Sequence, residues 1–190
     1  MGLLNFEHGD VSHRADIALY GVAVVGLASS TMATTPDGRV FAACGWALSG
    51  LAAWTLVEYL LHRFVLHRVP PFKRLHAAHH QRPTALIGSP TLMTATLFGL
   101  LVFAPSHAAF GLWRACALTL GMVSGYLAYI IIHHGVHHWR GSSPWLQRRR
   151  RWHGLHHRSP AQPACFGVTS GFWDYVFGTV DAVPPVAVSL

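Results

Sequence analysis

The sequence predicts an all-α integral membrane protein with four transmembrane helices and histidine clusters at one edge of the membrane. Three observations predict this class. Apolar residues make up 52% of the 190 residues and charged residues only 11%, whereas about 25% charged residues is usual in soluble domains. Four apolar stretches approach or exceed the roughly 20 residues that cross a bilayer. Twelve of the 15 histidines fall in four clusters close to the ends of these stretches.

The four apolar stretches cover residues 17–33, 40–61, 85–104 and 108–132, and Arg114 interrupts the last of them. The connections at 34–39 and 105–107 are very short, so we expect two tight helical hairpins. A length of 190 residues suits one domain better than two, which predicts a single domain over 1–190 with its motif-bearing core at 57–180. Acidic residues outnumber basic ones in the first 16 positions, which predicts no cleaved signal peptide.

The cations predict the orientation of these spans. The net charge is +7, and 11 of the 14 Lys and Arg residues lie between the second and third spans or after the fourth. Only Arg39 falls in the connections on the other side. Lys and Arg accumulate in cytoplasmic loops. The N-terminus, the central loop and the C-terminal tail are therefore expected on the cytoplasmic side.

Two glycines in the fourth span, Gly121 and Gly125, have the spacing G-x-x-x-G. This spacing lets two helices approach closely in lipid. Two small residues without any such contact are an equally good interpretation, and the sequence leaves both open.

The histidine clusters are the most informative feature of the chain. Each lies at the end of a predicted span or in the polar segment that follows, on the side expected to be cytoplasmic. In chain order they are His62 and His67; His76, His79 and His80; His133, His134, His137 and His138; and His153, His156 and His157. We expect no part in a site for the isolated His8, His13 and His107.

Helical geometry predicts how these side chains are directed. Residues three and four apart share a helix face, so each H-x-x-H-H motif is expected to present two or three imidazoles to one point, and His133 to pair with His137. A regular helix would separate His62 and His67, five residues apart, by about 140°. One of the two is therefore expected on a distorted or terminating turn.

The number of imidazoles predicts two metal ions. Imidazole suits iron, zinc, copper and nickel, so the residue type alone does not name the metal. A structural zinc site closes with four ligands, whereas about ten imidazoles would supply two ions with about five each. No Asp or Glu occurs between His62 and His157, which predicts an all-imidazole site. Glu58 and Asp174 are candidates to orient a histidine from outside the site, or ordinary buried polar contacts.

The order Glu58-Tyr59-x-x-His62-Arg63-x-x-x-His67, followed by His76-x-x-His79-His80, resembles the fatty acid hydroxylase superfamily, which includes sterol desaturases and hydroxylases. The later half resembles its fatty acid 2-hydroxylase branch. That half runs from Gly125-Tyr126-x-x-Tyr129 through His133-x-x-x-His137-His138 and His153-x-x-His156-His157 to the tail at 166–179. The resemblance covers 57–180.

This resemblance implies four transmembrane helices capped by a cytosolic helical layer that carries a dimetal site. By similarity the metal ligands are His62, His67, His76, His79, His80, His133, His137, His153, His156 and His157. His138 matches the motif without being an expected ligand. Two departures bear on the substrate: Ile130 stands where the branch often has an acidic residue, and His134 where it often has Tyr.

The resemblance implies a non-haem di-iron oxygenase of lipid biosynthesis that hydroxylates or desaturates a lipid with O2 and two electrons. Two iron ions are the expected cofactor, and zinc is an alternative occupant in purified material. A fatty acid, a sphingolipid, a sterol or a carotenoid from the bilayer would be the substrate. No fused cytochrome b5 domain is recognisable, so a separate cytochrome b5-like or ferredoxin-like donor with its reductase is expected. The arginine run at 148–151 would bind this donor or anionic lipid headgroups, or it only reflects the excess of cations on the cytoplasmic side of membrane proteins. Nucleic acid is not an expected partner.

Two other functions compete with this one. A carotenoid ring hydroxylase shares the small size and four histidine boxes, but the tail at 166–179 argues against it. A metal transporter or metal-storage protein is an alternative of another class. Transporters place coordinating groups near the bilayer midplane, whereas here every cluster is expected at the edge.

Overall fold

The computed structural model describes residues 6–158 and 164–180, so the domain expected over 1–190 extends beyond the described residues. Within them the fold is helical and contains no strand, only an isolated bridge between Glu7 and Ile87. Four helical segments are long and apolar enough to cross a membrane: Asp10–Thr34, Val40–Leu66, Thr91–Phe110 and Leu112–His138. The prediction of an all-α membrane protein with four spans is confirmed.

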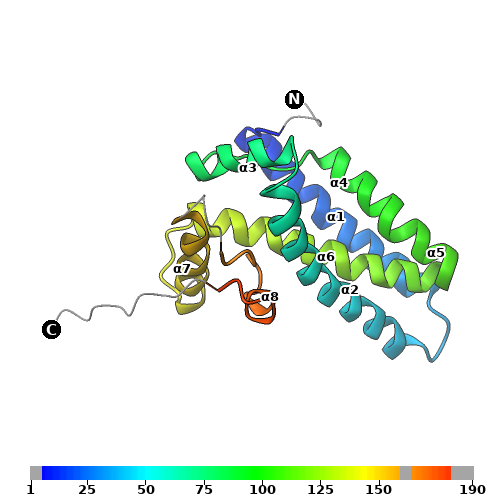
Figure 1. Cartoon of the computed structure of the whole chain (residues 1–190). Coiled ribbons are helices and arrows are strands. Elements are labelled where there is room, and N and C mark those ends of the chain that lie inside the picture. The colour runs from blue at the N-terminus through cyan, green and yellow to red at the C-terminus, as the bar shows by residue number, and fades with distance from the viewer. Residues whose placement is uncertain (1–5, 159–163, 181–190) are drawn as a thin grey trace.

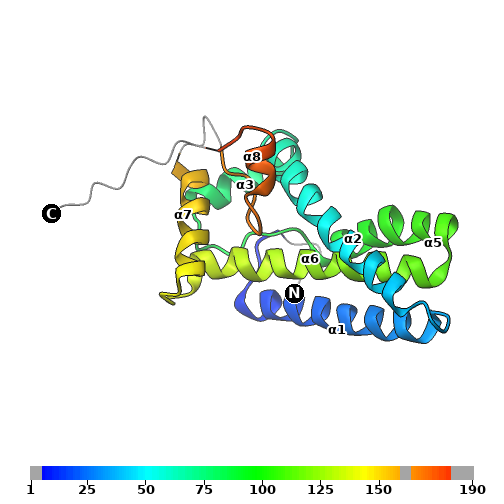
Figure 2. The same ribbon diagram turned by 90° about the horizontal axis from the view of Figure 1, so that it is seen from below.

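The first span is α1 (Asp10–Thr34), and the second is α2 (Val40–Leu60) continued by the π-helix η1 (Leu61–Leu66). The third consists of α4 (Thr91–Leu97), the π-helix η2 (Phe98–Phe103) and α5 (Ala104–Phe110), and the fourth is α6 (Leu112–His138). Three shorter helices, α3 (Phe72–Gln81), α7 (Pro144–Arg158) and α8 (Phe172–Val176), gather at one end of these spans (Figures 1 and 2). They form the cap.

The predicted bounds of the third span were wrong at both ends. Residues 85–90 are not helical, because this stretch pairs with the N-terminal segment through the bond from His8 N–H to the Leu86 carbonyl. Pro105, expected in a turn, lies inside the span. Proline removes a hydrogen bond and crowds the preceding helical turn, and the wider π-helical turn of η2 directly before it relieves that conflict. The chain reverses instead at Gly111, whose φ of 82° favours glycine.

Helix α6 is the centre of the bundle. It packs against α1, α2 and the third span, and it is the most buried of the four spans. Tyr20 of α1 and Trp54 of α2 meet Met122, Val123 and Tyr126 of α6 in a common core. The outer faces of the spans remain apolar and exposed, with Val22, Leu100 and Leu101 all more than half accessible, as lipid contact requires. This arrangement holds the end of α6 against the cap.

The glycine pair of α6 lies at a close helix crossing. A Cβ at Gly121 would lie 1.9 Å from the carbonyl oxygen of Ala47, and one at Gly125 would overlap the Trp54 side chain. Gly50 of α2 faces Leu118 of α6 in the same way, with a Cβ distance of 2.1 Å from its carbonyl oxygen. Of the two interpretations left open by the sequence, the close contact is therefore the right one.

Gly121→Ala is expected to destabilise the bundle, because α2 and α6 must separate to admit the new methyl group. Overpacking of this kind costs about 1–3 kcal/mol. The matched control is Gly45→Ala in α2, where a Cβ would meet nothing within 4 Å and the better helix propensity of alanine is neutral or stabilising. Thermal unfolding of both variants in detergent, followed by circular dichroism, measures the difference. Equal midpoints would contradict the close crossing.

Candidate metal centre

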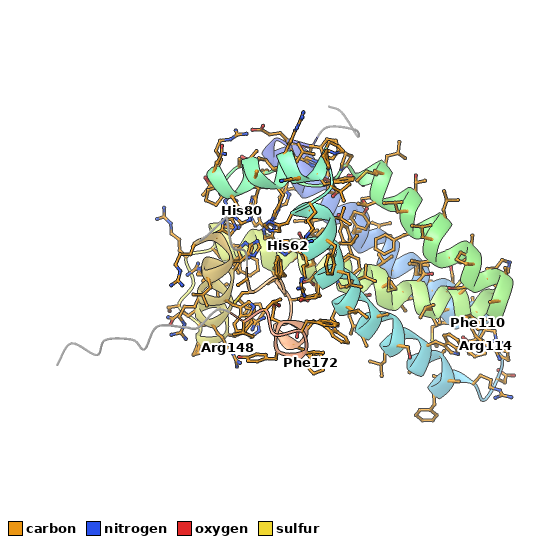
Figure 3. The ribbon with its side chains drawn as sticks, in the orientation of Figure 1. His62, His80, Phe110, Arg114, Arg148 and Phe172 are labelled. Carbon is orange, nitrogen blue, oxygen red and sulfur yellow. The ribbon has the colours of Figure 1, made fainter. Side chains whose placement is uncertain are left out.

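The ten histidines predicted as ligands come from four segments that meet where the spans join the cap. His62 lies in η1 and His67 follows it, while His133 and His137 lie in the last turns of α6. The remaining six come in equal numbers from α3 and α7: His76, His79 and His80, and His153, His156 and His157. Figure 3 shows His62 and His80 at this end of the bundle and Phe110 and Arg114 at the opposite end.

The spacing of His62 and His67 is explained by the π-helix. In a π-helix the hydrogen bonds run from residue i to i+5, so residues five apart come to the same side of the helix. The two imidazoles stack with ring centroids 5.4 Å apart. The expectation of a distorted turn is confirmed, and the distortion directs both side chains to one place.

The imidazoles form two adjacent groups. In the first group, four neighbouring Nε2 pairs are 3.0 Å apart and the fifth, between His67 and His156, is 3.2 Å apart. In the second, Nε2 of His153 lies 2.9 Å from that of His137 and 3.0 Å from that of His157, and the His79 and His133 atoms are 3.1 Å apart. The first group contains His62, His67, His76, His80 and His156, and the second contains His79, His133, His137, His153 and His157.

Each H-x-x-H-H motif directs two imidazoles to one point, as predicted, and its third imidazole to the other group. In α3 His76 and His80 belong to the first group and His79 to the second, while in α7 His153 and His157 belong to the second and His156 to the first. Residues four apart on a helix are separated by only about 40° around its axis, whereas the two adjacent histidines at the end of each motif are separated by about 100°. Each cap helix therefore lies between the two groups and supplies both. The pairing of His133 with His137 occurs as expected.

These distances fit metal coordination. Metal–nitrogen bonds of about 2.0–2.1 Å place two nitrogens about 3.0 Å apart when they subtend 90° at the ion, and about 3.4 Å apart at a tetrahedral angle. The observed separations of 2.9–3.2 Å correspond to angles of about 90–100° at bonds of this length. Two sites of five imidazoles, each with more than four ligands, are consistent with this spacing.

The imidazoles are held in the neutral form that binds metal. Burial, together with the neighbouring imidazoles, lowers the pKa of His67 to about 4 and those of His79 and His157 to about 3. Burial also lowers the pKa values of His153 and His156 well below the usual range. At neutral pH these rings are uncharged and each keeps one nitrogen lone pair, so a metal can bind without a proton having to be displaced.

A loop at 164–171 fixes the orientation of two rings. Nδ1 of His62 donates to the Phe166 carbonyl at 2.6 Å, and Nδ1 of His156 donates to the Ala164 carbonyl at 2.9 Å. A ring that donates from Nδ1 leaves Nε2 as the free lone pair. His62 and His156, which both belong to the first group, are thereby oriented to bind a metal through Nε2.

Two buried carboxylates hold this loop. Asp174 accepts from the backbone N–H groups of Phe166 and Gly167 at 2.7 and 2.9 Å and from the Thr179 hydroxyl. Glu58 accepts from the N–H groups of Val168 and Thr169 and from the Thr169 hydroxyl. Both carboxylates therefore act on the histidines through the loop, and burial raises the pKa of Asp174 against the effect of its hydrogen bonds.

The other histidines lie outside the two groups. His134 stacks on His138 with centroids 4.3 Å apart and on His13 of α1 with centroids 4.7 Å apart, so both turn toward α1. His107 is exposed in α5. His8 forms an ion pair with Asp16, a contact between the N-terminal segment and α1 that no motif in the sequence signals.

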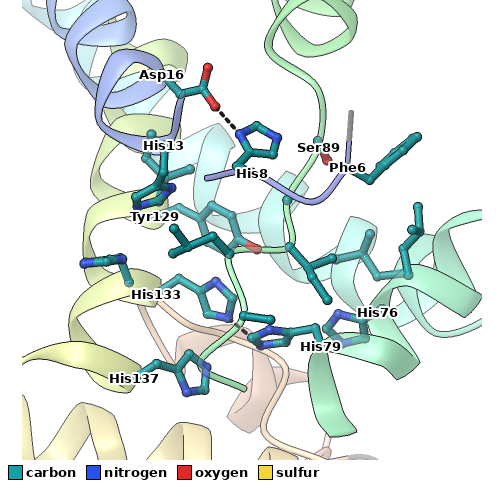
Figure 4. A pocket seen from close by; sticks show the side chains of 18 of the residues that line it. Phe6, His8, His13, Asp16, His76, His79, Ser89, Tyr129, His133 and His137 are labelled. Atoms are coloured by element: carbon teal, nitrogen blue, oxygen red, sulfur yellow. Dashed lines mark hydrogen bonds and ion pairs between the residues drawn. The ribbon is translucent and has the colours of Figure 1, made fainter. Parts of the chain in front are cut away.

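A cavity of about 140 Å³ opens beside the second group. His76, His79, His133 and His137 line one part of it, and Tyr129 stacks parallel to His133. Figure 4 shows these side chains across the cavity from His8, His13 and Asp16. A small chemical group of a bound ligand in this cavity would contact the imidazoles.

Fold and site together define a multi-pass membrane protein with a candidate dinuclear, all-histidine metal centre at one end of its spans. The sequence profile described as Fatty acid hydroxylase matches residues 47–179. The chain belongs to the fatty acid hydroxylase family, as the resemblance predicted.

Its relatives include fatty acid 2-hydroxylases. The chain is 32% identical over 73% of its length to a dihydroceramide fatty acyl 2-hydroxylase of Arabidopsis thaliana, and covers 61% of that protein. It is 36% identical over 72% of its length to a ceramide very long chain fatty acid hydroxylase of Saccharomyces cerevisiae, and covers 38% of it. The solved structure of full-length scs7p, with only the hydroxylase domain visible, superposes with a TM-score of 0.78 at 26% identity, over 96% of this chain and 69% of that one. The chain thus spans about 40–60% of these curated relatives.

Proposed function

We propose that this protein is a membrane-bound di-iron oxygenase that hydroxylates the acyl chain of a membrane lipid at the carbon next to the carbonyl group. The observation that carries the proposal is the pair of five-imidazole groups beside a cavity, in a chain of the fatty acid hydroxylase family. The names of the relatives, fatty acyl 2-hydroxylase and ceramide very long chain fatty acid hydroxylase, favour this position and favour hydroxylation over desaturation.

The ten histidines of the two groups are the proposed iron ligands. Bound there, two iron ions would supply the activation of dioxygen and the attack on an unactivated C–H bond, which no side chain can provide. All ten ligands are neutral, so the charge of the ions stays available to attract anionic oxygen species. Iron rather than zinc is the proposed metal because hydroxylation with O2 needs a redox-active ion, whereas zinc would bind the same imidazoles without supporting turnover.

The protein's own residues position the metal ligands and shield the cavity from water. The loop at 164–171 holds His62 and His156, and the core of α6 holds His133 and His137 against the cap. The acyl chain would reach the cavity from the bilayer between apolar helices, which keeps bulk water away. The overall reaction puts one oxygen atom of O2 into the C–H bond and reduces the other to water, which consumes two electrons and two protons from outside the chain.

The cytoplasmic face is the proposed location of the centre, because the cations cluster on that side. The electrons would come from a separate cytochrome b5-like or ferredoxin-like donor with its reductase. Within the run 148–151, Arg149 donates to the Thr169 carbonyl and Arg150 to the Gly141 carbonyl. Arg148 and Arg151 are exposed, and these two are available to an acidic donor.

Lipid analysis tests the function. Membranes from cells that express the protein, supplied with O2 and reductant, are expected to gain 2-hydroxyacyl lipids, identified by mass spectrometry of the released acyl chains. New hydroxylated carotenoids with no change in acyl chains would indicate the ring hydroxylase instead. Metal uptake by the cells without any oxidised lipid would indicate a transport or storage protein and refute the oxygenase.

Metal analysis tests the centre independently of activity. Purified protein reconstituted with Fe(II) under anaerobic conditions is expected to bind about two ions per chain, since each five-imidazole group can supply one ion with enough ligands. Inductively coupled plasma mass spectrometry with quantitative amino-acid analysis gives the ratio. A ratio near one would contradict the dinuclear centre.

A further inference from the structure

The wall of the cavity opposite the imidazoles is built by the N-terminal segment. His8 N–H donates to the Leu86 carbonyl and Gly88 N–H donates to the Phe6 carbonyl, both at 2.8 Å. These bonds attach residues 6–8 to the connection before α4. The segment is therefore held in place beside the cavity before any ligand arrives.

His8 is held in one orientation on this wall. Its Nδ1 lies 2.7 Å from Oδ2 of Asp16, and the two side chains are only 9% and 19% exposed. Asp16 also accepts a hydrogen bond from the Thr91 hydroxyl of α4. Nδ1 of His8 therefore donates to the carboxylate, and Figure 4 shows the two side chains directed at each other.

The other nitrogen of His8 has no partner. Nε2 is buried and makes no hydrogen bond with the described residues, and the residue lines the cavity. Burying such an atom without a partner is unfavourable, because it loses its hydrogen bond to water and gains none. The more exposed ion pair between Glu7 and Arg82 fixes the same segment from outside but leaves Nε2 unsatisfied. An unpartnered, oriented nitrogen on a cavity wall indicates a ligand that completes it.

The charges of the cavity specify the kind of ligand. No Lys or Arg is among the residues that line it, and Asp16 is its one carboxylate. On the wall formed by residues 6–8 an anionic headgroup would meet the Asp16 carboxylate and no Lys or Arg, which is unfavourable. A neutral group with an N–H or O–H and a carbonyl suits Nε2 in either protonation state of the ring, since Nε2 accepts when the ring is neutral and donates when it is charged.

We propose that His8, oriented by Asp16, is a headgroup subsite that binds the neutral amide or hydroxyl end of the lipid substrate. The inference rests on the proposed function and adds a specificity-determining residue to it. The cavity is smaller than the roughly 300–1,000 Å³ that encloses a whole small ligand, so it takes only the headgroup and its nearest carbons. Binding of the headgroup at His8 leaves the first carbons of the acyl chain facing His79 and His133, which selects a position counted from the carbonyl end.

Two variants test the subsite in reconstituted, iron-loaded protein. The substrates are an N-acyl amino alcohol and the free fatty acid with the same acyl chain. His8→Leu is expected to raise KM for the amide about three- to tenfold, the effect of one lost hydrogen bond, with kcat within about twofold of the unaltered protein. His8→Gln keeps a polar group at this place and is expected to restore much of the loss. His107→Leu, at an exposed position in α5, is the matched control and should behave as the unaltered protein.

The outcomes separate the subsite from the proposed function. An unchanged KM for the amide in His8→Leu, or an equal rise in KM for both substrates, would overturn the subsite while leaving the oxygenase intact. If the unaltered protein oxidises neither lipid, the proposed function fails, and binding of the N-acyl amino alcohol measured by native mass spectrometry decides the subsite alone. Binding that is weakened in His8→Leu and retained in His107→Leu supports it, and equal binding in all three proteins refutes it.

Discussion

His156→Ala is expected to abolish lipid hydroxylation and to reduce bound iron from about two ions per chain to about one. His156 is completely buried, and its Nε2 lies within 3.2 Å of those of both His67 and His80. Its removal leaves the first group with four imidazoles and a gap that bulk water does not reach. Losing even a residue that only orients a ligand costs 10–100-fold in metal affinity or activity, so losing a ligand should cost at least about a hundredfold in turnover.

His79→Ala is the counterpart in the second group, where His79 meets His133 at 3.1 Å. The same loss of one ion and of product is expected. Iron content by mass spectrometry and 2-hydroxyacyl product by lipid analysis are measured on the same preparations, with His107→Ala as control. Full activity or full iron in either variant would contradict the ligand assignment.

Asp174→Asn is expected to be the most damaging substitution outside the ten histidines. One carboxylate oxygen accepts from Phe166 N–H and the other from Gly167 N–H. An asparagine has one carbonyl oxygen, so whichever way its amide turns, its NH2 group faces a backbone N–H. A buried donor left unsatisfied costs about 1–3 kcal/mol, and the displaced loop would release His62 and His156.

Glu58→Gln is the matched variant with a milder expected effect. Oε1 accepts the two backbone N–H groups, while Oε2 accepts from the Thr169 hydroxyl. A glutamine can keep its oxygen toward the backbone and donate its NH2 to that hydroxyl, which can act as an acceptor.

We therefore expect Asp174→Asn to lose iron affinity about 10–100-fold and Glu58→Gln to lose much less. Anaerobic iron titration of both proteins measures the contrast. Equal affinities in the two variants would mean that the carboxylates do not act through this loop.

The sequence by itself determined the class of this protein and the residue types of its metal centre. Apolar stretches of bilayer length allow only helices that satisfy their own backbone hydrogen bonds, so four spans follow from composition and length. The spacing of His62 and His67 already required a distorted turn, and the absence of Asp and Glu between His62 and His157 made the groups all-imidazole. Whether Gly121 lies at a helix contact or is only a small residue could be decided only from the position of the neighbouring helix α2.

Only the tertiary structure decided how the histidines divide. Spacing within one helix predicts which rings share a face, but α3 and α7 each lie between two groups, so His79 and His156 join histidines of other segments. Likewise, His8 and Asp16 meet because residues 6–8 pair with the connection before α4, a contact between segments far apart in sequence. Local periodicity carries no information about such contacts. They depend on how the helices pack, which is why the partition of the ligands and the polar wall of the cavity could not be predicted.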